Sequence, residues 1–190
     1  MNNLMKQVAM MTAAFLVLLS FTLEASETQM NWQPPAFEAQ DADGSTVRFP
    51  QDLDGPAIVL FWAGWCPYCK ALMPHLQSIV DEYGDDIEIL ALNFRDDEDP
   101  VAFIDERGFD FHLITEAGPV AELWGVKAIP ALFLVDRSGQ AVFSNYAIPE
   151  EAYPTDAKEQ AGDLKHYQKA ARRAPFWAAQ LRRAIDGIQE

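Results

Sequence analysis

The two cysteines of this 190-residue chain, Cys66 and Cys69, are separated by two residues. A lone pair at this spacing can pass between a dithiol and a disulfide, so it predicts thiol–disulfide exchange. The pair follows the continuous apolar run Ile58–Trp62, which predicts a strand buried on both faces, and adjoins the predicted helix Pro67–Glu82. Unpaired N–H groups at a helix N-terminus stabilise a thiolate, so Cys66 is the predicted nucleophile. Cys69, one turn later, is placed to resolve a mixed disulfide.

Other uses of a cysteine pair explain this spacing less well. A structural disulfide that closes so short a loop would remove little entropy from the unfolded chain. A zinc site needs about four ligands, and the histidines, His75, His112 and His166, show no ligand spacing. No metal is therefore predicted in the site, although a Cu(I) ion held by the two thiolates remains an alternative.

The other elements are predicted from hydrophobic periodicity and turn residues. They are a hairpin around Asp41–Gly44, a second buried strand at Ile87–Phe94, a helix at Pro100–Arg107 capped by Asp99, a short strand at Phe111–Ile114, a short helix at Pro119–Trp124, and a hairpin of Ala131–Val135 with Ala141–Ser144. After a Pro-containing linker around Ile148–Thr155, two helical stretches divided near Pro175 are expected. Strands that alternate with helices and close in a hairpin indicate an α/β fold with a mixed central sheet.

The chain is strongly acidic, with 14 Lys and Arg against 29 Asp and Glu and a formal net charge of −15. Such a charge repels polyphosphate, so no nucleic-acid partner is expected. The length and an apolar content of 49% suit one domain with a substantial core. Residues 157–190 differ, because they carry seven basic and four acidic side chains. A solvated amphipathic helix explains this basic tail most simply, and docking on its own acidic domain or on a partner protein is the alternative.

The N-terminus is organised like an export signal. Lys6 is the only charge before Glu24, and Val8–Leu19 is an almost unbroken apolar stretch. This stretch is short for a bilayer span, which needs about 20 residues, so residues 1–25 are predicted to be a signal peptide cleaved near Ala25. An uncleaved anchor in the inner membrane is the alternative. Either way, the folded part is expected to work in the periplasm.

The segment Phe61–Lys70, with the sequence FWAGWCPYCK, resembles the active-site stretch of the thioredoxin superfamily. Pro74 stands where that family has a proline in its first active-site helix, and Ile129-Pro130 resembles its cis-proline loop. The pattern is closest to the exported TlpA/ResA/DsbE-like branch. The resemblance implies a thioredoxin fold at residues 26–145, a central mixed sheet flanked by helices, with an N-terminal hairpin and a central insertion. A linker and a C-terminal helical extension would occupy residues 146–190.

The resemblance also implies residue roles. Cys66 would be the attacking thiol and Cys69 the buried resolving thiol, so a redox-active Cys66–Cys69 disulfide would serve without any bound cofactor. The backbone of Ile129, beside a cis Pro130, would pair with an extended segment of a substrate protein that carries cysteines or a disulfide. An apolar contact surface around Cys66 would be formed by Trp65, Pro67 and Tyr68.

Two positions depart from the family. Leu60 replaces the buried Asp that thioredoxin has six residues before its first cysteine. Leu72 replaces the Glu that several cytochrome-maturation members have three residues after the second cysteine. The usual helper for proton transfer is missing at both places, so a specific role in cytochrome c maturation is not predicted. Glu116, Glu122 and Lys70 are the candidate substitutes.

The residues around the dithiol bear on the direction of electron flow. Pro67-Tyr68 matches the dipeptide of glutaredoxins, whose potentials lie between those of thioredoxin and the oxidant DsbA. Ile129 before the cis-proline is the thioredoxin choice. We therefore expect a monomeric enzyme that reduces disulfides in periplasmic proteins and receives electrons from a membrane protein. A disulfide oxidase or isomerase, a copper-binding module and a pure interaction protein remain the alternatives.

Overall fold

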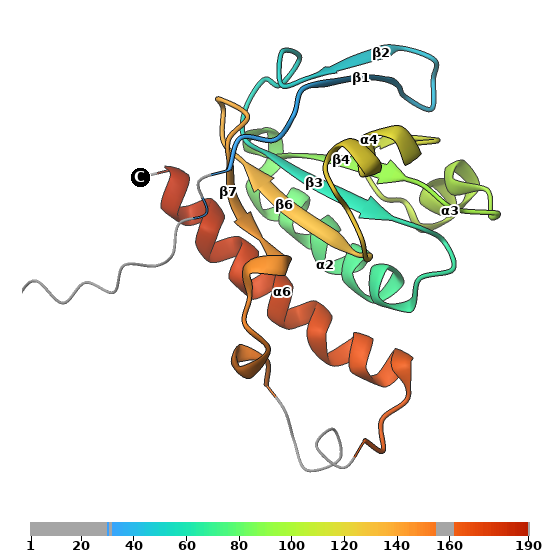
Figure 1. Ribbon diagram of the computed structural model, residues 1–190, viewed down its shortest axis with the longest axis vertical. Helices are drawn as coiled ribbons and strands as arrows, with labels where there is room; N and C mark the ends of the chain where they lie inside the picture. The colour runs from blue at the N-terminus through green and yellow to red at the C-terminus, as the bar shows by residue number, and fades with distance from the viewer. Residues whose placement is uncertain (1–29, 31, 155–161, 190) are drawn as a thin grey trace, which may run out of the picture.

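The computed structural model describes residues 30, 32–154 and 162–189 (Figure 1). The predicted signal peptide, residues 1–25, lies outside the described residues. Within the described part of the chain, no helix is both long enough and apolar enough to cross a membrane.

A five-stranded mixed sheet forms the centre of the molecule, in the order β5-β4-β3-β6-β7 (Figure 1). Its strands are β3 (Ala57–Trp62), β4 (Glu88–Asn93), β5 (His112–Ile114), β6 (Ala131–Val135) and β7 (Ala141–Ser144). β3, β4 and β5 are parallel, whereas β6 is antiparallel to β3 and β7 is antiparallel to β6. Every residue of β3 is buried, because other elements cover both faces of the sheet. The predicted mixed sheet is confirmed.

The predicted N-terminal hairpin is confirmed as a separate two-stranded sheet of β1 (Phe37–Gln40) and β2 (Thr46–Phe49). The Asp41 carboxylate closes its turn by accepting hydrogen bonds from the N–H groups of Asp43 and Ser45. An Asp at this position mimics a backbone turn, which explains why a short polar segment is enough to pair the two strands.

Helices cover one face of the sheet more fully than the other. The described α-helices are α2 (Pro67–Tyr83), α3 (Pro100–Arg107), α4 (Gly118–Leu123) and α6 (His166–Gln189). α2, α3 and α6 pack on one face, while α4 and the β1–β2 hairpin pack on the other (Figure 1). The predicted cap of α3 is confirmed, because the Asp99 carboxylate accepts hydrogen bonds from the N–H groups of Val101 and Ala102.

The prediction of two C-terminal helical stretches divided near Pro175 is wrong. α6 is one helix of 24 residues that runs through Pro175. Proline removes one backbone hydrogen bond from a helix, but Pro175 itself is exposed and disturbs no buried contact. The apolar face of α6 continues across it against α2 and the sheet, with buried Ala170, Ala174, Trp177, Ala178, Leu181 and Ile185. This packing outweighs the local helix-breaking tendency.

The segment predicted as a linker is partly ordered onto α6. Two single 3₁₀ turns, Asn145–Ala147 and Glu150–Ala152, follow β7. Tyr153 is buried, and its hydroxyl oxygen accepts a hydrogen bond of 2.9 Å from Trp177 Nε1. The segment after β7 therefore packs on α6, whereas the sequence analysis predicted only a linker that leads to it.

Candidate active site

Cys66 occupies the N-cap position of α2, in the turn that follows β3. Its sulfur accepts a hydrogen bond of 3.3 Å from the backbone N–H of Cys69. Both thiols are free, and only 2% of Cys66 and none of Cys69 is exposed. The start of the helix thus brings the two thiols together at the edge of the core.

The two thiols lie in different electrostatic environments. A hydrogen bond from the Cys69 thiol is the largest cause that lowers the pKa of Cys66 below its ordinary value; backbone N–H groups and the Lys70 charge also lower it, whereas burial opposes them. Burial raises the pKa of Cys69 well above its ordinary value, and the neighbouring Cys66 raises it further. Cys66 is therefore the better thiolate of the pair, which suits a nucleophile with a buried resolving partner.

The loop before β6 lies against the dithiol. The peptide bond between Ile129 and Pro130 is cis. The carbonyl oxygen of Ile129 lies 3.7 Å from Cys66 Sγ. Pro130 is buried, whereas Ile129 is partly exposed. The main chain of Ile129 is thus adjacent to the thiol that a substrate would have to reach.

Asn145 and Tyr146, in the turn after β7, hold this loop, and the sequence analysis missed both. The buried Asn145 side chain donates a hydrogen bond of 2.9 Å to the Pro130 carbonyl and accepts one of 2.9 Å from the Leu132 N–H. The Tyr146 hydroxyl donates to the Ala128 carbonyl and accepts from the Ala128 N–H. Polar residues directly after the last strand were the only signal available in the sequence.

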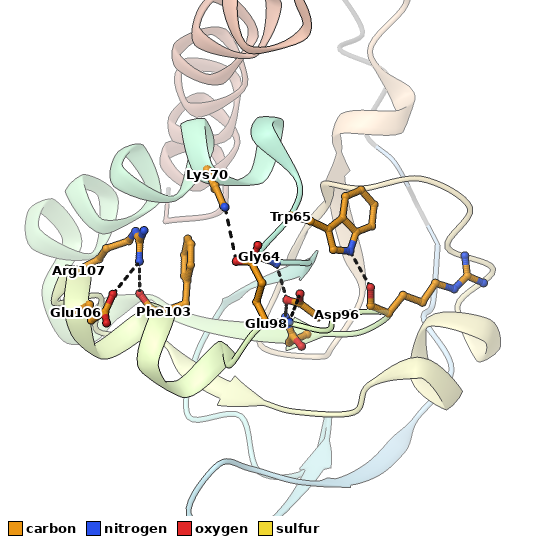
Figure 2. A network of polar contacts seen from close by, with 10 residues as sticks. Gly64, Trp65, Lys70, Asp96, Glu98, Phe103, Glu106 and Arg107 are labelled. Atoms are coloured by element: carbon orange, nitrogen blue, oxygen red, sulfur yellow. Dashed lines mark hydrogen bonds and ion pairs between the residues drawn. The ribbon is translucent and has the colours of Figure 1, made fainter.

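The loop that follows β4 braces the turn before the dithiol (Figure 2). The Asp96 carboxylate accepts hydrogen bonds from the Gly64 N–H at 2.5 Å and from Asn93 Nδ2 at 2.7 Å. The indole N–H of Trp65 donates to the Arg95 carbonyl at 2.7 Å. These contacts hold Trp65 beside the reactive thiol, and the sequence analysis did not predict them.

A hollow of about 500 Å³ opens beside the dithiol. Four residues predicted to contact substrate line it together with Cys66, namely Trp65, Pro67, Tyr68 and Ile129. Pro130 is not among the lining residues, because it is buried behind the loop. The structure therefore gathers most of the predicted contact residues around one concave surface, although 54% of Trp65 is exposed.

α6 forms part of the same surface, which the sequence analysis did not anticipate. The ring of Tyr68 lies 6.3 Å from that of His166 and 6.2 Å from that of Trp177, both on α6. His166 also lines the hollow directly. The C-terminal extension is thus adjacent to the residue between the two cysteines.

The positions where the family has acidic helpers are fully buried and apolar, since Leu60 and Leu72 are 0% exposed. Of the suggested substitutes, Glu116 and Glu122 are exposed and do not line the hollow. Lys70 pairs with Glu98 at 3.6 Å, and its charge contributes to the lowered pKa of Cys66 (Figure 2). Among the three candidates, only Lys70 therefore acts electrostatically on the dithiol.

The histidines are dispersed in the structure. Nε2 of His112 lies 3.1 Å from the Asp41 carboxylate at the N-terminal hairpin, far in sequence from the cysteines. Across the described ranges, no group of three or more His, Cys, Asp or Glu side chains could hold a metal ion.

Comparison with known proteins places the chain in a family. The sequence profile of the AhpC/TSA family matches residues 31–143. Thiol-disulfide oxidoreductase ResA of Halalkalibacterium halodurans is 28% identical over 127 residues, which cover 65% of this chain and 72% of ResA. The thiol:disulfide interchange protein DsbE homolog of Paracoccus denitrificans is 36% identical over 89 residues, which cover 45% of this chain and 48% of that protein.

A solved structure supports the same grouping at the level of the fold. The thioredoxin domain of a thiol-disulfide oxidoreductase from Bacteroides vulgatus matches with a TM-score of 0.56 at 22% identity, covering 61% of this chain and 87% of that domain. The predicted thioredoxin fold is thereby confirmed. The chain belongs to the AhpC/TSA family, and it is similar to thioredoxin-like thiol-disulfide oxidoreductases of the ResA and DsbE types.

Proposed function

We propose that this thiol-disulfide oxidoreductase is an exported enzyme that reduces disulfides of periplasmic proteins through Cys66 and Cys69. The observation that carries the proposal is the asymmetry of the dithiol at the N-terminus of α2. The lowered pKa of Cys66 makes its thiolate available at a lower pH than that of an ordinary cysteine. The raised pKa of buried Cys69 keeps that thiol protonated until it is needed.

In the proposed reaction the Cys66 thiolate attacks one sulfur of a substrate disulfide. A Cys66–substrate mixed disulfide forms, and the other substrate sulfur leaves as a thiolate that takes a proton from solvent. Cys69 then loses its proton and attacks Cys66 Sγ, which forms the Cys66–Cys69 disulfide and expels the second substrate thiolate. The substrate disulfide gains the two electrons that the enzyme dithiol loses. Of the two protons that the substrate thiols take up, one balances the proton released by Cys69 and the other comes from solvent, because Cys66 reacts as a thiolate.

The contact residues would guide this reaction. The main chain of Ile129, beside Pro130, would pair with an extended substrate segment in the manner of an added strand. Trp65, Pro67 and Tyr68 would cover the apolar side chains next to the substrate cysteine.

Reduction is the proposed direction for two reasons. Ile129 before Pro130 is the thioredoxin choice. The resemblance to the exported TlpA/ResA/DsbE-like branch favours the same direction. A reductant in an oxidising compartment also needs an electron donor, which we place in the inner membrane. Export to the periplasm would depend on the signal predicted at residues 1–25.

The first test is the reduction potential of the Cys66–Cys69 pair, measured by equilibration of the full chain with dithiothreitol or glutathione. We expect a value of about −250 mV or lower, near thioredoxin. A value of about −120 mV would indicate a DsbA-like oxidant and reverse the proposed direction. Absence of any redox couple, with stoichiometric Cu(I) uptake, would favour a copper-binding module.

The second test separates the two cysteines. In a disulfide reduction assay, Cys66→Ala should lower the rate by about three orders of magnitude or more, because the nucleophile is lost. Cys69→Ala should accumulate covalent complexes with substrate that dithiothreitol releases. Full multiple-turnover activity of Cys69→Ala would contradict the dithiol mechanism.

A further inference from the structure

The hollow beside the dithiol has a charge opposite to that of the molecule as a whole. Among its lining residues, the ionisable side chains other than Cys66 and Tyr68 are Arg95, Lys127 and His166. No Asp or Glu lines it in the described part of the chain, although the whole chain carries a net charge of −15. Its remaining walls are largely aromatic and apolar. A cavity of this size, with a few charged groups on apolar walls, is typical of a binding site.

Arg95 is held at the edge of this hollow by its surroundings. Its backbone has a φ of 54°, in the left-handed region that costs a non-glycine residue energy and is found mostly at functional sites. The hydrogen bond from the Trp65 indole to the Arg95 carbonyl supports this conformation. The guanidinium carbon of Arg95 lies 5.4 Å from the centre of the Phe94 ring, another wall of the hollow.

Two of the acidic residues that follow Arg95 in sequence are committed elsewhere, and the exposed Asp97 forms no ion pair with Arg95 in the described part of the chain. The Asp96 carboxylate accepts hydrogen bonds from Gly64 and Asn93, and Glu98 pairs with Lys70 (Figure 2). Neither Arg95 nor Lys127 makes an ion pair with any residue that the structure describes. Two cationic side chains that line the same hollow as the reactive thiol are therefore left without an acidic partner among the described residues.

We propose that the hollow selects acidic substrate segments, in which Asp or Glu side chains flank the reacting cysteine and pair with Arg95 and Lys127. The first turn of α6 also lines the hollow, with His166 near Tyr68. This inference rests on the proposed function, since it names the class of segment that reaches Cys66. The charge complementarity is local, because at longer range the acidic molecule repels acidic partners.

The test uses the reduced full chain and three matched peptide disulfides that differ only beside the cysteine, where they carry Glu, Gln or Lys. Second-order rate constants are measured by stopped flow at low ionic strength. We expect the Glu peptide to react about tenfold faster than the Gln peptide, because each of the two charge pairs should raise the rate about two- to fivefold. The Lys peptide should react more slowly than the Gln peptide. The preference should largely disappear in about 0.5 M salt, because exposed charges are screened.

Variants assign the preference to the proposed residues. Arg95→Gln and Lys127→Gln should each lower the ratio of the Glu-peptide rate to the Gln-peptide rate about threefold. Arg137→Gln is the matched control, because Arg137 is exposed in the β6–β7 turn and does not line the hollow. It should leave the ratio unchanged.

Four results would overturn the proposal. Reduction of the Gln peptide without preference for Glu, or a preference that both Arg95→Gln and Lys127→Gln preserve, would remove this inference and leave the proposed function intact. Equal rates for the three peptides, together with co-sedimentation of the protein with phosphatidylglycerol vesicles, would indicate that the basic hollow binds a membrane surface. If none of the peptides is reduced, the proposed function fails and this inference fails with it.

Discussion

The face of the central sheet that carries the dithiol and the opposite face are packed with different kinds of side chain. Around Cys66 and Cys69 the core is mostly aliphatic and is covered by α2 and α6, as Leu72, Met73 and Leu76 illustrate. The opposite face, under α4 and the β1–β2 hairpin, also buries aliphatic side chains but contains a connected cluster of aromatic rings. Its members are Trp32, Phe37, Phe49, Phe61, Trp124 and Phe133.

Both faces bury a tryptophan that donates a hydrogen bond, but to different kinds of acceptor. On the aromatic face, Trp124 Nε1 donates to the main-chain carbonyl of Pro35 at 3.0 Å. On the dithiol face, Trp177 Nε1 donates to the Tyr153 hydroxyl, and the Trp177 ring packs near Tyr68. The comparison teaches that the aromatic face contains neither cysteine and reaches the hollow only at its margin, through Phe94 and Ile129, whereas packing on the other face reaches the residue between the two cysteines.

The largest expected effect tests the separation of the two faces. Trp124→Ala should lower the free energy of unfolding by about 3–5 kcal/mol, because it removes the ring at the centre of the aromatic cluster and leaves a cavity. The reduction potential of the folded protein should change little, since neither cysteine belongs to this cluster. Urea unfolding and a redox titration measure the two quantities.

Leu123→Ala is the control for this substitution, because Leu123 adjoins Trp124 in sequence and is 52% exposed. It should cost no more than about 0.5 kcal/mol. A shift of about 30 mV in the potential of Trp124→Ala, equivalent to about 1.4 kcal/mol, would show that the two faces are coupled and would break the comparison.

A smaller effect is expected from the tryptophan on the dithiol face. Tyr153→Phe keeps the ring that packs on Trp177 but removes the acceptor of its buried N–H, so it should cost about 1–3 kcal/mol. Tyr83→Phe is the matched control. It removes an accessible hydrogen bond of 2.7 Å to Asp186, also between α6 and another element, and should cost less than about 1 kcal/mol. Equal losses in urea unfolding would mean that burial of the tryptophan N–H does not matter.

The features that could be predicted from the sequence are those that neighbouring residues determine. The CxxC spacing at a strand-to-helix junction, the Asp41 turn and the Asp99 cap are local patterns, and the structure contains all of them. The helix break predicted at Pro175 was wrong for the same reason. Proline does weaken a helix locally, but the continuous apolar face of α6 outweighs this effect.

The supports of the site are contacts over long separations in sequence, which no local pattern encodes. Gly64 and Asp96 are 32 residues apart, and Trp65 and Arg95 are 30 apart. One rule would have helped: β3 and β4 are parallel, so the polar loop after β4 had to lie beside the turn that precedes Cys66. The contact of Tyr68 with α6 had no comparable signal, since nothing in the sequence states where a C-terminal helix packs.

The smallest expected effect concerns the two thiols themselves and sharpens the description of the dithiol face. Only the thiolate reacts with iodoacetamide, so the lowered pKa of Cys66 should bring its alkylation rate to half its maximum at a lower pH than for an ordinary cysteine.

The hydrogen bond from the Cys69 thiol is the largest cause of the lowered pKa of Cys66. Cys69→Ala removes this donor and should shift the alkylation profile of Cys66 to higher pH, whereas Cys69→Ser keeps a hydroxyl donor and should preserve more of the lowering. The Cys69 backbone N–H remains bonded to Cys66 in both variants, so the difference between their profiles isolates the side chain. Identical profiles would show that the helix N-terminus and Lys70 activate Cys66 without the Cys69 thiol, which would then serve only to resolve the mixed disulfide.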